Sequence, residues 1–130
     1  MKYDFVIIGG GGSGLAAAMY AARLKLKTLV LGFTHGTELP VGGVITTTNI
    51  VENYPGFEKL TGFELAKKIE KHARGYKEVT IKEEKAEKIK KSGKGFEVKT
   101  KNGKYFGKTL LFATGTKWRE LDVKGAKEFK

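Results

Sequence analysis

Hydrophobic residues occur along this chain in short continuous runs that are separated by glycine-rich segments. Residues 4–8 and residues 28–31 are two such runs, and both are rich in valine, isoleucine or leucine. Continuous apolar runs of this length are typical of strands that are buried on both faces of a parallel sheet. Residues 15–25 lie between them and predict an alanine-rich helix. Together these segments predict a strand–helix–strand unit.

The end signals of a second helix are also present. Thr61 and Glu64 have the spacing of a capping box, with Thr61 as the N-cap, and Leu60 and Leu65 occupy the positions of a hydrophobic staple. Gly75 suits the end of this helix, because glycine is common just after the last helical residue. We therefore expect a helix between Thr61 and Gly75.

Short strands are predicted after that helix. Val79 and Ile81 alternate with polar residues, which is the pattern of a strand. Residues 85–107 predict antiparallel strands joined by tight turns, and Asn102-Gly103 is a strong hairpin signal. The segment is therefore expected to form a β-meander.

Two further segments differ in polarity. The charged run of residues 82–91 is interpreted as one solvated strand face. Residues 109–113 return to a continuous apolar pattern and predict another buried strand, which Thr114-Gly115 ends.

A long connection covers residues 32–57 and is rich in glycine, threonine and proline. Loops of this length are usually functional or disordered. This one contains Val44, Ile45, Ile50 and Val51, which makes it too apolar for plain disorder. We interpret it as a functional loop.

The glycine turn after the first predicted strand carries candidate chemistry. Gly9, Gly11 and Gly14 match the fingerprint of dinucleotide-binding proteins, in which glycines permit a tight turn, close approach of a pyrophosphate and close helix packing. The following helix would add unpaired N–H groups for the diphosphate. A purely structural glycine turn is the alternative. In such proteins an acidic residue at the end of the second strand usually binds the ribose, but the sequence there ends in Gly32 and Phe33. Glu38 lies deeper in the loop, so the residue that would bind the ribose is unassigned.

Composition excludes several classes. The chain has 130 residues, enough for one domain, and no cysteine, which excludes disulfide scaffolds and cysteine chemistry carried by these residues alone. It has no run of ~18 apolar residues for a membrane-spanning helix and no signal-peptide core, so we expect a cytoplasmic protein. His35 and His72 lack partners at ligand spacing, so no metal site is expected, and Trp118 is interpreted as a surface residue.

The charge balance changes the picture less. The net charge is +11, but all except three of the 25 basic residues are lysines, and they are spread beside many glutamates. Lysine and glutamate enrichment is a thermophile pattern. We therefore interpret the charge as a solvated thermophile-type surface, and nucleic-acid binding is a minor alternative.

Four blocks in fixed order carry a family resemblance. They are residues 5–11, 42–48, 51–57 and 111–115, and the chain resembles the N-terminal part of a low-molecular-weight thioredoxin reductase. This resemblance implies an α/β, Rossmann-like FAD-binding domain over residues 1–130. A parallel sheet and a crossover β-meander would form three layers, truncated before the NADPH domain.

The resemblance also implies FAD as the cofactor. The glycine turn would hold the diphosphate, Gly32 and Phe33 would lie near the adenosine ribose, and the backbone at Ala86 would meet the adenine. The loop after Gly42 would run beside the flavin, although Val44 stands where the family commonly has glutamine. The implied cofactor-binding residues are Gly9, Gly11, Gly12, Ser13, Gly14, Gly32, Phe33, Gly42, Gly43, Val44, Ile45, Asn53, Ala86, Ala113, Thr114 and Gly115.

In a complete enzyme of this family, electrons pass from NADPH to FAD and then to a disulfide. The family's redox cysteine pair, its NADPH domain and a closing C-terminal segment are expected to lie outside these residues, so this chain alone is not expected to reduce disulfides. It would be a fragment or one half of a split flavoprotein, completed by a second chain or segment, and a homo-oligomer is an open expectation. The alternative is a non-catalytic dinucleotide-binding or assembly module. No nucleic-acid or membrane partner is expected.

Overall fold

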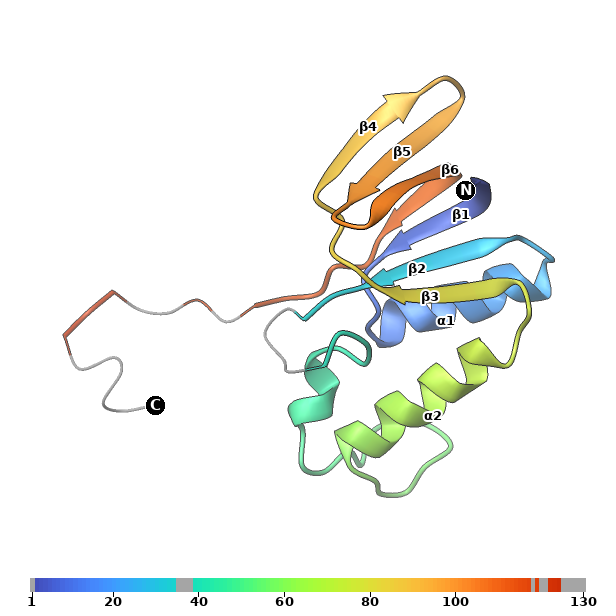
Figure 1. Cartoon of the computed structure of the whole chain (residues 1–130). Coiled ribbons are helices and arrows are strands. Elements are labelled where there is room, and N and C mark those ends of the chain that lie inside the picture. Colours follow the sequence, from blue (N-terminus) through green and yellow to red (C-terminus); the bar gives the residue numbers. More distant parts are fainter. Residues whose placement is uncertain (1, 35–38, 118, 120–121, 125–130) are drawn as a thin grey trace.

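The computed structural model describes residues 2–34, 39–117, 119 and 122–124, and it contains one six-stranded sheet with two α-helices (Figure 1). The order of strands across the sheet is β3-β2-β1-β6-β5-β4. The elements along the chain are β1 (Lys2–Ile8), α1 (Gly12–Arg23), β2 (Thr28–Gly32), the short 3-10 helix η1 (Val44–Thr47), α2 (Gly62–Arg74), β3 (Val79–Glu83), β4 (Lys88–Ser92), β5 (Gly95–Thr100) and β6 (Gly103–Phe112).

The first four strands of that order are parallel. The prediction of a buried strand at residues 109–113 is wrong, because none of these residues is buried and Phe112 is 63% exposed, although Leu110 and Leu111 pack in part against the core. β1 lies in the middle and pairs with β2 on one side and with β6 on the other. Ile7 is fully buried there, as are Leu29 and Val30 of β2. Both continuous apolar runs are therefore confirmed as buried parallel strands, and β1 begins two residues earlier than predicted.

β6 joins the two halves of the sheet as one strand of ten residues. Its residues 103–107 pair antiparallel with β5, and residues 106–112 pair parallel with β1. The sequence suggested a hairpin strand and a separate buried strand. Gly107 lies at the junction, where a Cβ would come within 2.7 Å of a Val6 methyl group, so the missing side chain lets the strand continue without a break.

The molecule has three layers, as predicted. Ile7 and Val30 face the helices and contact Ala18 of α1. On the opposite face, Val6, Leu29 and Leu31 contact the meander, which contributes Val98 and Tyr105 to the same cluster. The parallel strands thus lie between α1 and α2 on one side and the meander on the other.

The capping box of α2 is confirmed. The Glu64 amide donates to the Thr61 hydroxyl oxygen at 3.1 Å, and the Thr61 amide donates to the Glu64 carboxylate at 2.8 Å. The helix ends at Arg74 and Gly75 follows, but with φ −67° this glycine is right-handed, so the left-handed stop typical of glycine is not used. α1 begins at Gly12, three residues before the predicted start, because the glycine turn itself contributes its first turn.

The interpretation of residues 82–91 as one strand face is wrong. β3 ends at Glu83, and residues 84–87 cross to the other layer before β4 begins at Lys88. The crossing is fixed in part by Glu84, whose side chain is only 10% exposed and hydrogen-bonds to the meander. A polar run in the sequence therefore contains a carboxylate that is largely, though not fully, buried.

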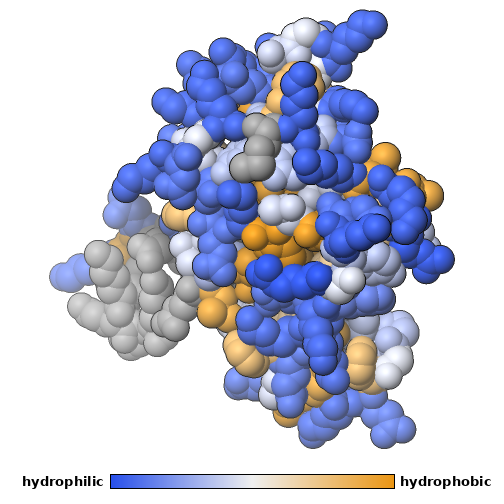
Figure 2. Space-filling model, turned by 45° about the vertical axis from the view of Figure 1, so that its right-hand side comes forward, coloured by the Kyte–Doolittle hydropathy of each residue, from blue (hydrophilic) through white to orange (hydrophobic). Residues whose placement is uncertain are grey.

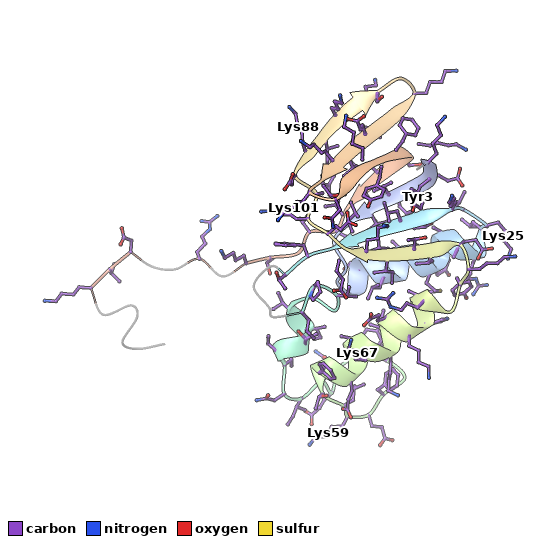
Figure 3. The ribbon with its side chains drawn as sticks, in the orientation of Figure 1. Tyr3, Lys25, Lys59, Lys67, Lys88 and Lys101 are labelled. Atoms are coloured by element: carbon purple, nitrogen blue, oxygen red, sulfur yellow. The ribbon has the colours of Figure 1, made fainter. Side chains whose placement is uncertain are left out.

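Most lysines lie at the surface. Figure 3 shows Lys25, Lys59, Lys67, Lys88 and Lys101 at the periphery of the fold. Hydrophilic residues cover most of the face seen in Figure 2, with hydrophobic side chains exposed near its middle. Among the described residues, no helix is long and apolar enough to cross a membrane.

Candidate functional site

A groove lies at the carboxyl ends of the parallel strands, beside the central strand β1. Two adjoining pockets form it, with volumes of about 60 Å³ and 170 Å³. Gly9, Phe33 and Thr114 line both pockets, so the two lie side by side. This is the position where ligands bind in open α/β sheets, because the chain leaves neighbouring strands in opposite directions there.

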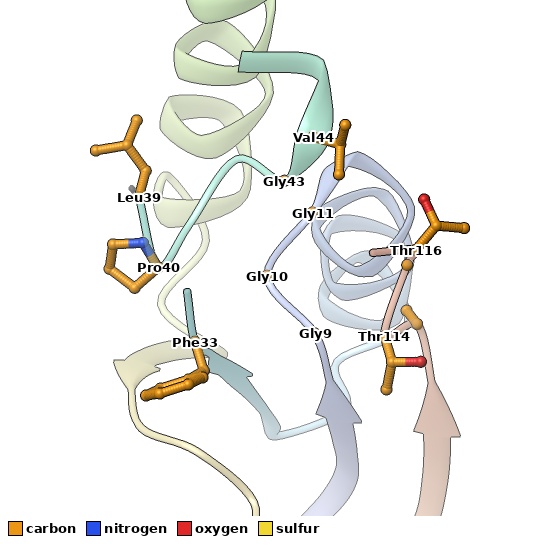
Figure 4. A pocket seen from close by; sticks show the side chains of 12 residues that line it. Gly9, Gly10, Gly11, Phe33, Leu39, Pro40, Gly43, Val44, Thr114 and Thr116 are labelled. Atoms are coloured by element: carbon orange, nitrogen blue, oxygen red, sulfur yellow. The ribbon is translucent and has the colours of Figure 1, made fainter. Parts of the chain in front are cut away.

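Five glycines and seven residues with side chains line the first pocket (Figure 4). Its lining comes from the glycine turn, the end of β2, the loop before η1 and the segment after β6. The lining residues are Gly9, Gly10, Gly11, Phe33, Leu39, Pro40, Gly43, Val44, Ala113, Thr114, Gly115 and Thr116.

Two glycines of the fingerprint are required by the fold. Gly9 has φ +119°, and a Cβ there would overlap the carbonyl oxygen of Ala113 after β6. A Cβ at Gly14 would overlap the carbonyl oxygen of Gly9. These two positions therefore let the turn and α1 lie against the ends of the strands.

Gly11 is different. It is the N-cap of α1 with φ −77° and ψ −179°, a conformation that any residue adopts. A Cβ there would meet only the Cα of Gly43, at an ordinary contact distance of 3.7 Å. The fold does not need a glycine at Gly11, yet this residue lines the groove.

The N-terminus of α1 opens at the same place. No side chain caps it, and its first turn holds no acidic residue. The amides of a helix's first turn lack partners within the helix, and the helix dipole places partial positive charge there. The groove thus meets a helix end suited to an anion.

The loop before η1 is held against the glycine turn by backbone contacts. The Gly42 amide donates to the carbonyl oxygen of Gly10 at 2.8 Å, and Gly42 forms an isolated bridge with Gly11. Gly42 and Gly43 have φ +123° and +76°, which explains the paired glycines. A Cβ at Gly32 would lie 2.5 Å from the carbonyl oxygen of Pro40. Residues 40–43 of the long connection are thus held against the glycine turn and the end of β2.

The second pocket combines apolar and charged walls. Its apolar lining includes Ile8, Leu31 and Ala86, and the Lys85 ammonium lies 5.4 Å from the centre of the Phe33 ring. Glu84 also lines it.

Glu84 is held by the meander. The Thr100 hydroxyl donates to it at 2.6 Å, and the Tyr105 hydroxyl donates at 2.9 and 3.0 Å to its two oxygens. Burial alone would raise the pKa of Glu84, but these hydrogen bonds and the nearby Lys82 outweigh it, so the pKa lies below its ordinary value. Burial and the bond to the carboxylate raise the pKa of Tyr105.

The structure brings together nine of the residues expected from the sequence. These groove residues are Gly9, Gly11, Phe33, Gly43, Val44, Ala86, Ala113, Thr114 and Gly115. The other seven do not line it: Gly12, Ser13, Gly14, Gly32, Gly42, Ile45 and Asn53. Gly32 and Gly42 support the wall from behind, whereas Asn53 is exposed in the loop after η1.

Sequence reasoning missed several lining residues. Ile8 and Leu31 were findable, because they are close to the carboxyl ends of predicted parallel strands. Gly10 lies inside the fingerprint, and Leu39, Pro40 and Thr116 flank expected residues. Glu84 and Lys85 gave no signal within a charged run. Glu38, His35 and Trp118 lie outside the described residues, so their expected roles stay predictions.

Residues 3–130 match the pyridine nucleotide-disulphide oxidoreductase family. The chain belongs to this family. It is 45% identical over 122 residues to the 34.2 kDa protein in the rubredoxin operon of Clostridium pasteurianum, covering 94% of this chain and 38% of that protein. It is 35% identical over 127 residues to thioredoxin reductase of Bacillus subtilis, covering 97% of this chain and 38% of that protein.

The fold gives the same assignment. The crystal structure of T. acidophilum thioredoxin reductase is similar with a TM-score of 0.85 and 35% identity, covering 99% of this chain and 40% of that chain. The resemblance to thioredoxin reductases and the Rossmann-like fold class are thereby confirmed. The chain spans 38–40% of the length of these family members.

Proposed function

We propose that this chain forms the FAD-binding part of a thioredoxin-reductase-like flavoprotein oxidoreductase. Residues 1–130 would bind the cofactor, and the complete enzyme would pass electrons from NADPH through FAD to a disulfide. With no cysteine of its own, the chain would not form the redox-active disulfide. An NADPH-binding part would come from a second chain or segment. The cytoplasmic location and thermophilic origin stay predictions.

One observation carries the proposal. Gly11 lines the groove at the uncapped N-terminus of α1, and neither its backbone conformation nor its neighbours require a glycine. A glycine without a structural reason, at a helix end suited to anions, is accounted for by a diphosphate that approaches the backbone closely.

The walls of the groove fit the rest of the cofactor. The second pocket, with its apolar lining and the Phe33 ring, would hold the adenine end. Gly43 and Val44 would border the flavin, with Thr114 closing the groove from the β6 side. Val44 offers only methyl groups there, so its side chain would make no hydrogen bond to the flavin.

The flavin would supply the redox chemistry when bound. The chain would orient it: α1 would stabilise the diphosphate charge, and the backbone walls would limit water on the side they cover. These contributions bind and position, and they need no acid or base from the chain.

The test is an absorption spectrum of the purified chain before and after addition of excess FAD and desalting. We expect retained flavin absorbance, and we expect Gly11→Val to abolish it, because the side chain would enter the space of the diphosphate. Ala16→Val is the control, since it also introduces a valine side chain, at an exposed position of α1.

Parallel titrations with FAD, NADPH and ADP separate the alternatives. A marked preference for FAD supports the proposal. Equal affinity for all three, or no binding by a chain that is folded by circular dichroism, supports a non-catalytic module and overturns it.

A further inference from the structure

The connection between β3 and β4, residues 84–87, crosses from one layer to another, and its first three residues, 84–86, form one wall of the second pocket. Figure 1 shows it passing beside the carboxyl ends of β2 and β3. Ala86 packs against the core cluster beneath the meander, and the Glu87 amide donates to the Lys99 carbonyl oxygen at 2.8 Å. The end of this wall is thus tied to β5 through backbone.

The beginning of the wall is tied through a side chain instead. Glu84 accepts the Thr100 hydroxyl at 2.6 Å and the Tyr105 hydroxyl at 2.9 and 3.0 Å. Its side chain is 10% exposed, and Lys82 lies 3.8 Å from one carboxylate oxygen. A carboxylate that accepts several hydrogen bonds at a largely buried position fixes its own backbone firmly.

Glu84 is followed by the residues that face the ligand space. The Lys85 ammonium lies 5.4 Å from the Phe33 ring centre, so the wall also contacts the aromatic residue that both pockets share. The contacts therefore run without a gap from the meander through Glu84 and Lys85 to Phe33.

We infer that Glu84 is a positioning residue for the adenine end of the groove, holding Lys85 and Ala86 against the ligand through its bonds to Thr100 and Tyr105. The inference rests on the proposed function, because it takes an adenine-bearing dinucleotide as the ligand. It adds a residue that neither the glycine fingerprint nor the loop contains. Glu84 itself stays bonded to the meander and acts through its neighbours.

A general structural role makes a different prediction. If the Glu84 carboxylate only stabilises the meander, its removal would lower the affinity for every ligand of the groove to a similar extent. If Glu84 instead positions the wall at the adenine end, its removal should lower the affinity only for ligands that reach that end. FAD and ADP contain the adenosine, whereas FMN does not, so the three ligands separate the two roles.

The experiment measures dissociation constants of FAD, ADP and FMN for the wild-type chain and for Glu84→Ala, Glu84→Gln and Glu87→Ala. We expect Glu84→Ala to raise the dissociation constants of FAD and ADP by about tenfold and to leave that of FMN unchanged. Glu84→Gln keeps an oxygen that accepts from Tyr105, so it should restore most of the affinity. Glu87→Ala removes an exposed carboxylate from the same segment and should change nothing.

If circular dichroism shows that Glu84→Ala does not fold, Thr100→Val and Tyr105→Phe test the inference instead, since each removes a single hydroxyl partner of Glu84. Each should raise the dissociation constants of FAD and ADP by about threefold and leave that of FMN unchanged. Unchanged FAD affinity in the folded variants, or an equal loss for FMN, overturns the positioning role alone. A wild-type chain that is folded but binds neither FAD nor ADP overturns the proposed function and this inference together.

Discussion

The Gly42 amide donates a hydrogen bond of 2.8 Å to the carbonyl oxygen of Gly10, and this bond joins the long loop to the glycine turn. No side chain takes part in it. Two segments some thirty residues apart are thus held together as a surface of bare backbone. This arrangement creates positions where only glycine fits, and under the proposed function it would let the cofactor approach the peptide groups directly.

Gly42→Ala should therefore destabilise the chain, whereas Gly11→Ala should not. Gly42 has φ +123°, and a Cβ there would lie 2.7 Å from the Thr46 methyl group. We expect a loss of about 1–3 kcal/mol in the free energy of unfolding, measured by urea titration. Gly11→Ala should change this free energy by about 0.5 kcal/mol or less but lower the affinity for FAD. Similar losses of stability in both variants would contradict the distinction between the two glycines.

Phe33→Ala should lower the affinity of the chain for FAD without unfolding the protein. Phe33 lines both pockets and is 48% exposed, so it contributes little to the core. Loss of an aromatic contact worth about 0.5–1.5 kcal/mol predicts FAD binding weakened by about threefold to tenfold. Phe63→Ala is the matched control, because Phe63 is 47% exposed and lies on α2, outside the groove. Equal effects of the two substitutions on FAD affinity would argue against a ligand contact at Phe33.

The pH dependence of stability should contain a contribution from Glu84. The pKa of this carboxyl is lower in the folded protein than its ordinary value of 4.5, so the unfolded chain binds the proton more readily. The contribution is complete above that ordinary value and is lost as the pH falls through the folded pKa. The groups that face Glu84 are Lys82 from β3, Thr100 from β5, Asn102 from the turn and Tyr105 from β6.

Urea unfolding between about pH 6 and pH 3 measures this contribution. Glu84→Gln should remove it, giving a shallower loss of stability with acid than the wild-type chain. Glu87→Gln removes an exposed carboxylate of the same connection and serves as the control. A Glu84→Gln curve parallel to that of the wild-type chain would show that the bonds to Thr100 and Tyr105 are not formed in solution.

Thr61→Ala should destabilise α2. The Thr61 hydroxyl accepts the Glu64 amide at 3.1 Å, and alanine cannot replace this cap. We expect a loss of about 1 kcal/mol, measured as a lower midpoint of thermal unfolding. Thr61→Ser keeps the hydroxyl and should remain within a few tenths of a kcal/mol of the wild-type chain. If serine and alanine behave alike, the capping box does not stabilise this helix.

The parts of the fold set by local sequence were predictable. The apolar runs of β1 and β2, the capping box at Thr61 and the hairpin signal at Asn102-Gly103 each act within a few neighbouring residues. The glycine fingerprint also located part of the groove lining, because its strand-to-helix context is local.

Contacts between distant segments were not predictable in the same way. Glu84 meets Thr100 and Tyr105, which are 16 and 21 residues away, only after the meander has folded over the sheet. Nothing in a charged run distinguishes the one glutamate whose side chain is largely enclosed. The continuity of β6 could not be predicted for a similar reason. Gly107 lets the strand continue because it lies against Val6, which is distant in the sequence.

The pairing of β1 with β6 also sets the order of events during biosynthesis. Asp4 and Lys108, joined by an ion pair across these strands, are 104 positions apart. While the ribosome makes the residues between them, the first strand and its glycine turn have no neighbour on that side, and Ala113 is not yet present to close the turn. Long-range pairing of this kind forms slowly and leaves an apolar edge exposed in the meantime. The groove therefore forms only after β6 and the residues that follow it have been synthesised, because Ala113, Thr114 and Gly115 are part of its lining.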